Sequence, residues 1–237
     1  MERYKGALTV TRKELRTYFT TPIAYIVITV FLAITGWLFF STFFLYGQAE
    51  MRGFFELLPL AFAFVVPAIT MRLFSEEKNT GSFEILMTLP VSTIDVLAGK
   101  ILAGTVFTFI MLLPTIIYAV SISFVGEPDL GPVFGGYFGA VLLAAAFSAI
   151  GVFSSSLTKN QIVAFIIGFA ICLLLTLMGK FLFFLPGSMV NVIEYIGAEY
   201  HFMNIARGII DLQDIIYFLS VTAIAGIATH YVLEERR

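Results

Sequence analysis

Six intervals of the chain carry almost no charge, and each is long enough to cross a membrane. They cover residues 22–46, 54–73, 96–125, 132–157, 161–185 and 215–233. A helix needs about 20 mainly apolar residues to cross a bilayer, and lipid requires each span to satisfy its own backbone hydrogen bonds. The mean hydropathy of +0.95 agrees with membrane burial, and no run alternates as a barrel strand does. The sequence therefore predicts an all-α integral membrane protein, a single transmembrane domain over residues 1–237 with six transmembrane helices.

Lysine and arginine are divided unevenly between the two sides of these spans. With the N-terminus inside, eleven basic residues are cytoplasmic and three, Arg52, Lys180 and Arg207, lie outside. Because cytoplasmic segments carry the excess of basic residues, we expect both termini to be cytoplasmic. The first span is too long for a signal-peptide core, so we expect it to be retained.

Residues 1–21 predict an amphipathic helix that lies on the inner leaflet and contacts membrane lipids. The stripe at helical spacing consists of Tyr4, Leu8, Thr11, Leu15 and Tyr18. Three basic residues, Arg12, Lys13 and Arg16, are displaced from this stripe. The alternative is a solvated basic leader that only fixes the topology.

Ionisable residues in the spans lie close to span ends, where long side chains reach the lipid headgroups. They are Glu56, Lys100, Lys180 and His230. No proton relay is visible between them. Pro59 and Pro67 in the second span and Pro114 in the third predict kinks, and the alternative is that these prolines are tolerated in the membrane for packing reasons alone. Small residues four apart in the fourth span, such as Gly135 and Gly139, predict close helix packing.

Signatures of enzymes and of cofactor sites are missing from the sequence. Gly99 and Lys100 are adjacent, but Ile101 follows where a P-loop requires Ser or Thr, and neither H-E-x-x-H nor G-x-S-x-G occurs. The single Cys172 rules out an internal disulfide. A net charge of −2 gives no indication of nucleic-acid binding. We expect a chain that is not an enzyme and that itself binds no cofactor, metal or nucleic acid.

Charged residues gather in the predicted cytoplasmic segment 74–95. Ser75 is expected to cap a short charged turn, and the sequence from Asn79 to Gly81 is expected to break it. A short helix over residues 82–89 then ends before Pro90. Ser92, with an acidic residue three positions later, is a capping signal for the third span.

The helix over residues 82–89 is too short to be stable alone, so it must pack on something. Its apolar face holds Phe83, Leu86 and Met87. One interpretation packs this face on the protein's own spans or in the inner leaflet. The other docks it in the groove of a cytosolic partner, with Glu76, Glu77 and Glu84 as polar contacts.

Residues 76–90 read EEKNTGSFEILMTLP and resemble the pattern E-E-x-x-x-G-x-x-E-x-L-x-x-x-P. That pattern precedes the third span in ABC-2 type permeases of ABC transporters. The stretches FTTPIAY, GVFSSSLTKNQIVAF and HFMNIARGIIDLQDIIYFLS are similar to the branch that includes the gliding-motility-associated permease GldF. The resemblance covers nearly the whole chain.

The resemblance implies an exporter of the bacterial inner membrane that works by alternating access. It also implies a separate cytosolic ATPase that binds ATP and Mg, and a dimer with a second copy or a paralogue. The coupling residues would be Glu76, Glu77, Gly81, Phe83, Glu84, Leu86 and Met87.

Residues 186–214 would form outer re-entrant helices, with Glu199, His201, Arg207 and Asp211 facing an envelope partner. Two alternatives stay open. One is an ion-coupled secondary transporter or channel, and the other is a non-transporting scaffold of an envelope machine.

Overall fold

The structure is a computed structural model that describes residues 3–46, 50–84, 91–126, 129–180 and 195–235. Within these ranges the ordered elements are helices, and no strand occurs. Six stretches of the described chain are long and apolar enough to cross a membrane. The prediction of an all-α integral membrane protein is confirmed.

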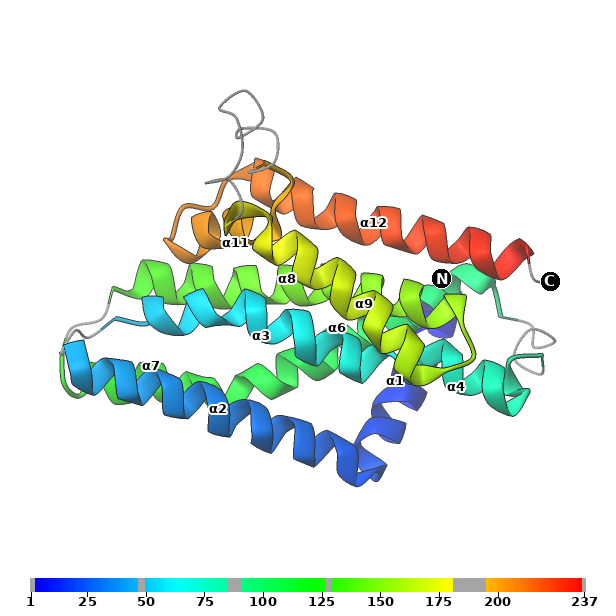
Figure 1. The fold of residues 1–237 in the computed structure, drawn as a ribbon, viewed down its shortest axis with the longest axis horizontal. Coiled ribbons are helices and arrows are strands. Elements are labelled where there is room, and N and C mark those ends of the chain that lie inside the picture. The colour runs from blue at the N-terminus through cyan, green and yellow to red at the C-terminus, as the bar shows by residue number, and fades with distance from the viewer. Residues whose placement is uncertain (1–2, 47–49, 85–90, 127–128, 181–194, 236–237) are drawn as a thin grey trace.

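The helices follow the order of the predicted spans (Figure 1). They are α1 (Arg3–Thr20), α2 (Pro22–Tyr46), α3 (Arg52–Thr70), α4 (Arg72–Thr80), α6 (Thr93–Leu112), the 3-10 turn η1 (Leu113–Thr115), α7 (Ile116–Ser123), α8 (Leu130–Leu157), α9 (Gln161–Leu177), α11 (Ala198–Ala206) and α12 (Leu212–Glu235). The α2 helix has the predicted bounds of the first span.

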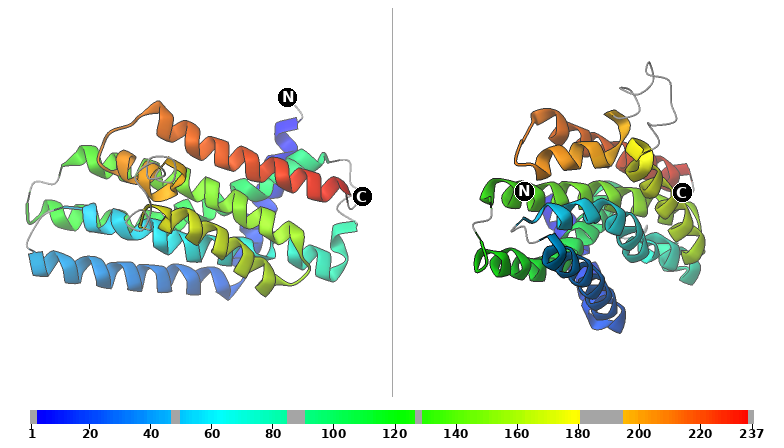
Figure 2. Two further views of the ribbon diagram at one scale, coloured as in Figure 1. Left: turned by 45° about the horizontal axis from the view of Figure 1, so that its top comes forward. Right: turned by 60° about the vertical axis from the view of Figure 1, so that its left-hand side comes forward.

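The long helices lie side by side, and α1 crosses one end of the bundle (Figure 2). That end also holds α4, the start of α6 and the end of α12. We call it the basic end, because lysines and arginines of α1, α4, α6 and the connection from α8 to α9 lie there, among them Arg12, Lys13, Arg16, Arg72, Lys78, Lys100 and Lys159.

Helix α8 occupies the centre and contacts α3, α6, α9, α11 and α12. Its small residues allow this close packing. A Cβ atom on Gly135 would stand 2.2 Å from the carbonyl oxygen of Ile205, and one on Gly136 would stand 2.3 Å from the Phe55 ring. The predicted close approach along the fourth span is confirmed.

The second span and the charged segment after it differ from the prediction. Helix α3 ends at Thr70, and α4 begins two residues later at Arg72 and continues to Thr80. Ser75 is therefore buried inside α4 and caps no turn. The predicted break at Gly81 is confirmed, because Gly81 closes α4 in the left-handed conformation with φ of 75°.

The three prolines of the second and third spans differ in their surroundings. Pro59 and Pro67 lie inside α3, which stays helical from Arg52 to Thr70, whereas Pro114 lies in η1, which interrupts the third span between α6 and α7. The Ser92 hydroxyl accepts a hydrogen bond from the Asp95 N–H and so caps α6.

Candidate functional site

Helix α1 lies directly on the backbone of α6 because Gly99 has no side chain. A Cβ atom there would stand 2.7 Å from both the Ala7 carbonyl oxygen and Val10 Cβ. The Thr11 hydroxyl donates to the Gly99 carbonyl oxygen at 3.0 Å. The α1 helix is therefore bound to the bundle along one face.

That face of α1 differs from the predicted stripe. Thr11 and Tyr18 of the stripe are buried against the bundle, whereas Leu8 is 61% exposed, and the acidic Glu14 is buried as well. The face of α1 that packs on the bundle therefore lies beside the predicted stripe and includes Glu14, while Leu8 stays exposed, as a side chain that contacts lipid would be.

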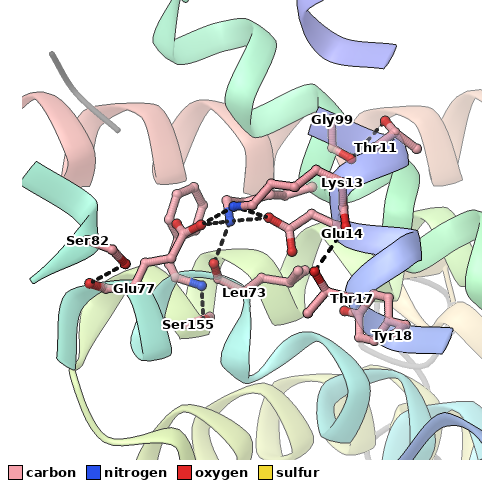
Figure 3. Close-up of polar contacts among 12 residues, drawn as sticks. Thr11, Lys13, Glu14, Thr17, Tyr18, Leu73, Glu77, Ser82, Gly99 and Ser155 are labelled. Atoms are coloured by element: carbon pink, nitrogen blue, oxygen red, sulfur yellow. Dashed lines mark hydrogen bonds and ion pairs between the residues drawn. The ribbon is translucent and has the colours of Figure 1, made fainter. Parts of the chain in front are cut away.

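Glu14 is buried because it belongs to an ion cluster with Lys100 (Figure 3). Lys100 Nζ lies 3.0 Å from Glu14 Oε1 and 2.9 Å from Glu77 Oε1. It also donates to the Leu73 carbonyl oxygen at 2.6 Å and lies 4.8 Å from the centroid of the Phe74 ring. One ammonium group thus connects α1, α4 and α6.

Lys13 completes the cluster from the exposed side. Its Nζ lies 3.3 Å from Glu14 Oε1 and 3.1 Å from Glu77 Oε1, so two cations face two carboxylates. We call Lys13, Glu14, Glu77 and Lys100 the junction cluster. A buried charge is tolerated when it is paired, and here the formal charges balance.

The pKa of Lys13 fits this arrangement. Burial alone would lower the pKa, but the charges of Glu14 and Glu77 outweigh it and raise the pKa above its ordinary value of 10.5. Because the folded pKa is the higher one, the stabilisation from Lys13 is complete below pH 10.5 and is lost as the pH rises through the folded pKa.

Tyr18 anchors the end of α1. Its hydroxyl donates to the Ile69 carbonyl oxygen at 3.0 Å, and the Arg72 guanidinium lies 4.7 Å from the ring centroid. Burial raises the pKa of Tyr18, which keeps the hydroxyl a neutral donor.

Helix α4 is held from the other side by the end of α8. Ser155 Oγ accepts hydrogen bonds from the Phe74 and Ser75 N–H groups at 2.9 and 3.0 Å, and it donates to the Met71 carbonyl oxygen at 2.6 Å. Lys78 Nζ donates to the Ser156 carbonyl oxygen. Since the Phe74 and Ser75 N–H groups and the Met71 carbonyl oxygen lie at the break between α3 and α4, Ser155 replaces hydrogen bonds that a continuous helix would make.

The predicted coupling residues lie in different surroundings. Glu77 belongs to the junction cluster, while Glu76 and Glu84 are exposed. Phe83 is half-buried, with its ring centroid 6.2 Å from that of Phe74. Leu86 and Met87 lie outside the described residues, as does most of the predicted helix 82–89.

Glu14 and Lys100 are the junction residues for which the sequence predicted no role at a site. Lys100 was expected to reach the lipid headgroups, and this was wrong, because its side chain is fully buried. The sequence contains one indication of a role for Glu14. This acidic residue lies three and four positions from Thr11 and Tyr18, and so on the same face of an otherwise basic helix.

A second buried polar group lies at the opposite end of the bundle. His201 on α11 is fully buried, and its Nδ1 lies 2.6 Å from Asp214 Oδ1 on α12. Its Nε2 lies 2.8 Å from the Tyr195 carbonyl oxygen, and its ring stacks on Tyr217 with centroids 4.0 Å apart. Asp214 had not been predicted as part of a site.

The partners of His201 fix its protons. A carbonyl oxygen only accepts, so Nε2 carries a hydrogen and donates it to Tyr195. Nδ1 faces a carboxylate oxygen, and a hydrogen bond there requires a second proton between His201 and Asp214. The pair is therefore imidazolium with carboxylate, or neutral imidazole with a carboxylic acid.

The other predicted outer residues do not join this pair. Glu199 lies 3.3 Å from the exposed Lys180, and Arg207 and Asp211 are exposed. Within the described ranges, no group of three His, Cys, Asp or Glu side chains is placed to hold a metal ion. Residues 186–194 of the predicted re-entrant segment lie outside the described residues.

The family model described as ABC-2 family transporter protein matches residues 8–236. The chain belongs to the ABC-2 transporter family. A search of curated proteins finds no match. This ABC-2 chain is thus a multi-pass membrane component of an ABC transporter.

Proposed function

We propose that this ABC-2 protein is the permease subunit of an exporter of the bacterial inner membrane, with both termini cytoplasmic. A separate cytosolic ATPase would bind ATP and Mg, and its cleft would receive the segment around residues 82–89. The permease would act as a dimer with a second copy or a paralogue. An envelope partner would bind the outer segment, residues 186–214, as the resemblance to the GldF branch suggests.

The observation that carries this proposal is the attachment of α4 on both of its sides. The junction cluster binds α4 to α1 and α6, and Ser155 and Ser156 bind it to α8. The exposed Glu76 and Glu84 remain available to a partner. A partner that displaced α4 would therefore move three helices of the bundle together.

The mechanism we propose is alternating access driven from outside the chain. ATP binding would close the paired ATPases, and the two coupling segments would follow. A ligand shifts a conformational equilibrium only through contacts that differ between the two states. Glu77 Oε2 is buried with no hydrogen-bond partner in the described part of the chain, so the cluster retains an acceptor that another state could satisfy.

The two alternatives fit the described residues less well. An ion-coupled transporter needs ionisable groups in a row through the membrane. Here the junction cluster and the His201–Asp214 pair lie at opposite ends of the bundle. A non-transporting scaffold would not require α4 to be fixed to α1 and to two spans, α6 and α8.

The test is co-purification with the P-loop ATPases encoded near the gene. We expect the variant Phe83→Ala with Glu84→Ala to retain at least tenfold less ATPase, or to hydrolyse ATP without transport, because truncating a buried interface anchor costs about 2 kcal/mol or more. Membrane insertion should be unchanged. Normal ATPase retention and transport in this variant, or a wild-type chain that purifies with no ATPase, would contradict the proposal.

A matched control removes the same two residue types from the other end of the bundle. Phe124 is 85% exposed, and Glu50 is exposed. The variant Phe124→Ala with Glu50→Ala should keep the ATPase at wild-type level, because neither residue lies near α4.

A further inference from the structure

We infer that Arg12 and Arg16 on α1 form a binding site for the phosphate of an anionic phospholipid in the leaflet at the basic end. This inference needs only the membrane embedding of the bundle, and it does not depend on transport or on an ATPase.

The two arginines lie together on the face of α1 that the bundle leaves open. They are four residues apart, so they are neighbours on the helix surface. Both are exposed, and among the described side chains neither has a hydrogen-bond or ion-pair partner. The opposite face of α1, with Thr11, Glu14 and Tyr18, is the one that packs on the bundle.

The two flanks of this face of α1 differ in polarity. On one flank, the centroid of the Phe19 ring lies 5.7 Å from that of Phe107 on α6 and 6.3 Å from that of Tyr25 on α2. The ring therefore packs against aromatic side chains of two spans. On the other flank, Lys13 contacts the carboxylate of Glu77 on α4, which is a polar neighbour. Arg12 and Arg16 lie between these flanks, at the boundary of apolar and polar surroundings.

Exposed apolar side chains on α1 and at the start of α2 are available to contact lipid tails. Leu8, one turn before Arg12, is 61% exposed, and Ile23 and Ile26 in the first turns of α2 are 55% and 60% exposed. An arginine fork binds phosphate oxygens in a bidentate way, and the arginine stem lies along apolar surface. Two unpaired positive charges favour an anionic lipid over a zwitterionic one.

The experiment measures lipid preference on the full chain in detergent. The chain is mixed with equal amounts of phosphatidylglycerol and phosphatidylcholine, and bound lipids are counted by native mass spectrometry. The wild type should prefer phosphatidylglycerol, and the preference should fall by about fivefold for each arginine removed in Arg12→Gln and in Arg16→Gln. Raising the salt concentration should weaken the wild-type preference.

The matched control is Lys159→Gln, which removes an exposed positive charge at the same end but away from α1. It should leave the preference at the wild-type value. An unchanged preference in the double variant Arg12→Gln with Arg16→Gln would overturn the inference, as would an equal loss in Lys159→Gln. Loss of the wild-type preference once an ATPase is bound would show that a protein covers this face, and would also overturn it.

Discussion

Lys100 is the residue on which the basic end depends most. Its ammonium group is fully buried and makes three polar contacts, to Glu14, to Glu77 and to the Leu73 carbonyl oxygen. Moving a lysine charge from water into the protein interior costs roughly several kcal/mol. The three contacts offset this cost while all of them are present. Removing one partner leaves the others buried and uncompensated, so the cluster acts as a unit.

At this scale we predict that Lys100→Met lowers the free energy of unfolding by about 3 to 5 kcal/mol, because two buried carboxylates lose their shared cation. Thermal unfolding of the detergent-solubilised chain measures this. The control Lys180→Met breaks the exposed pair with Glu199, and it should cost no more than about 1 kcal/mol. Adding Glu14→Gln and Glu77→Gln to Lys100→Met should restore most of the loss, and equal effects of the two lysine variants would contradict the prediction.

At the scale of elements, the break between α3 and α4 is held by one side chain from α8. The Ser155 hydroxyl has one hydrogen and two lone pairs, and its three hydrogen bonds use all of them. Since an unsatisfied buried N–H group is costly, the direction of α4 is tied to the end of α8.

We predict that Ser155→Ala destabilises the protein by about 1 to 3 kcal/mol, because it leaves two buried N–H groups of α4 without an acceptor. The control is Ser156→Ala, whose hydroxyl bonds only to the Phe153 carbonyl oxygen in its own helix. Its effect should stay below about 1 kcal/mol. Hydrogen exchange should show faster opening of α4 in the Ser155 variant alone, and equal exchange in both variants would count against the role of Ser155.

The elements themselves were largely predictable from the sequence, and the contacts between them were not. The start of α2 at Pro22, the break at Gly81 and the kink at Pro114 follow from local backbone chemistry. Glu14 and Lys100 are separated by 86 residues, and helical spacing reveals neighbours only within one helix. The same limit hid Asp214, whose partner lies on a different helix, and Ser155, which completes the hydrogen bonds of another helix.

At the scale of the whole molecule, charge is arranged along the bundle axis. The core of the described chain between the two ends is made of apolar side chains such as Phe62, Phe147 and Phe218. The junction cluster and the His201–Asp214 pair lie at opposite ends of the bundle. This is the distribution expected of a chain whose middle lies in hydrocarbon, because ionised groups are most costly at that depth.

The excess of basic residues at the end with α1 and α4 predicts that this end faces the cytoplasm. Cysteine labelling tests the prediction cleanly, because Cys172 is the only cysteine of the chain and is fully buried. Asn79→Cys places a thiol at the exposed end of α4, and Arg207→Cys places one at the opposite end. In intact cells, a membrane-impermeant thiol reagent should label Arg207→Cys, and it should label Asn79→Cys only after the membrane is opened. The reverse pattern would overturn the orientation, and equal labelling of both positions in intact cells would contradict a bundle that separates them across the membrane.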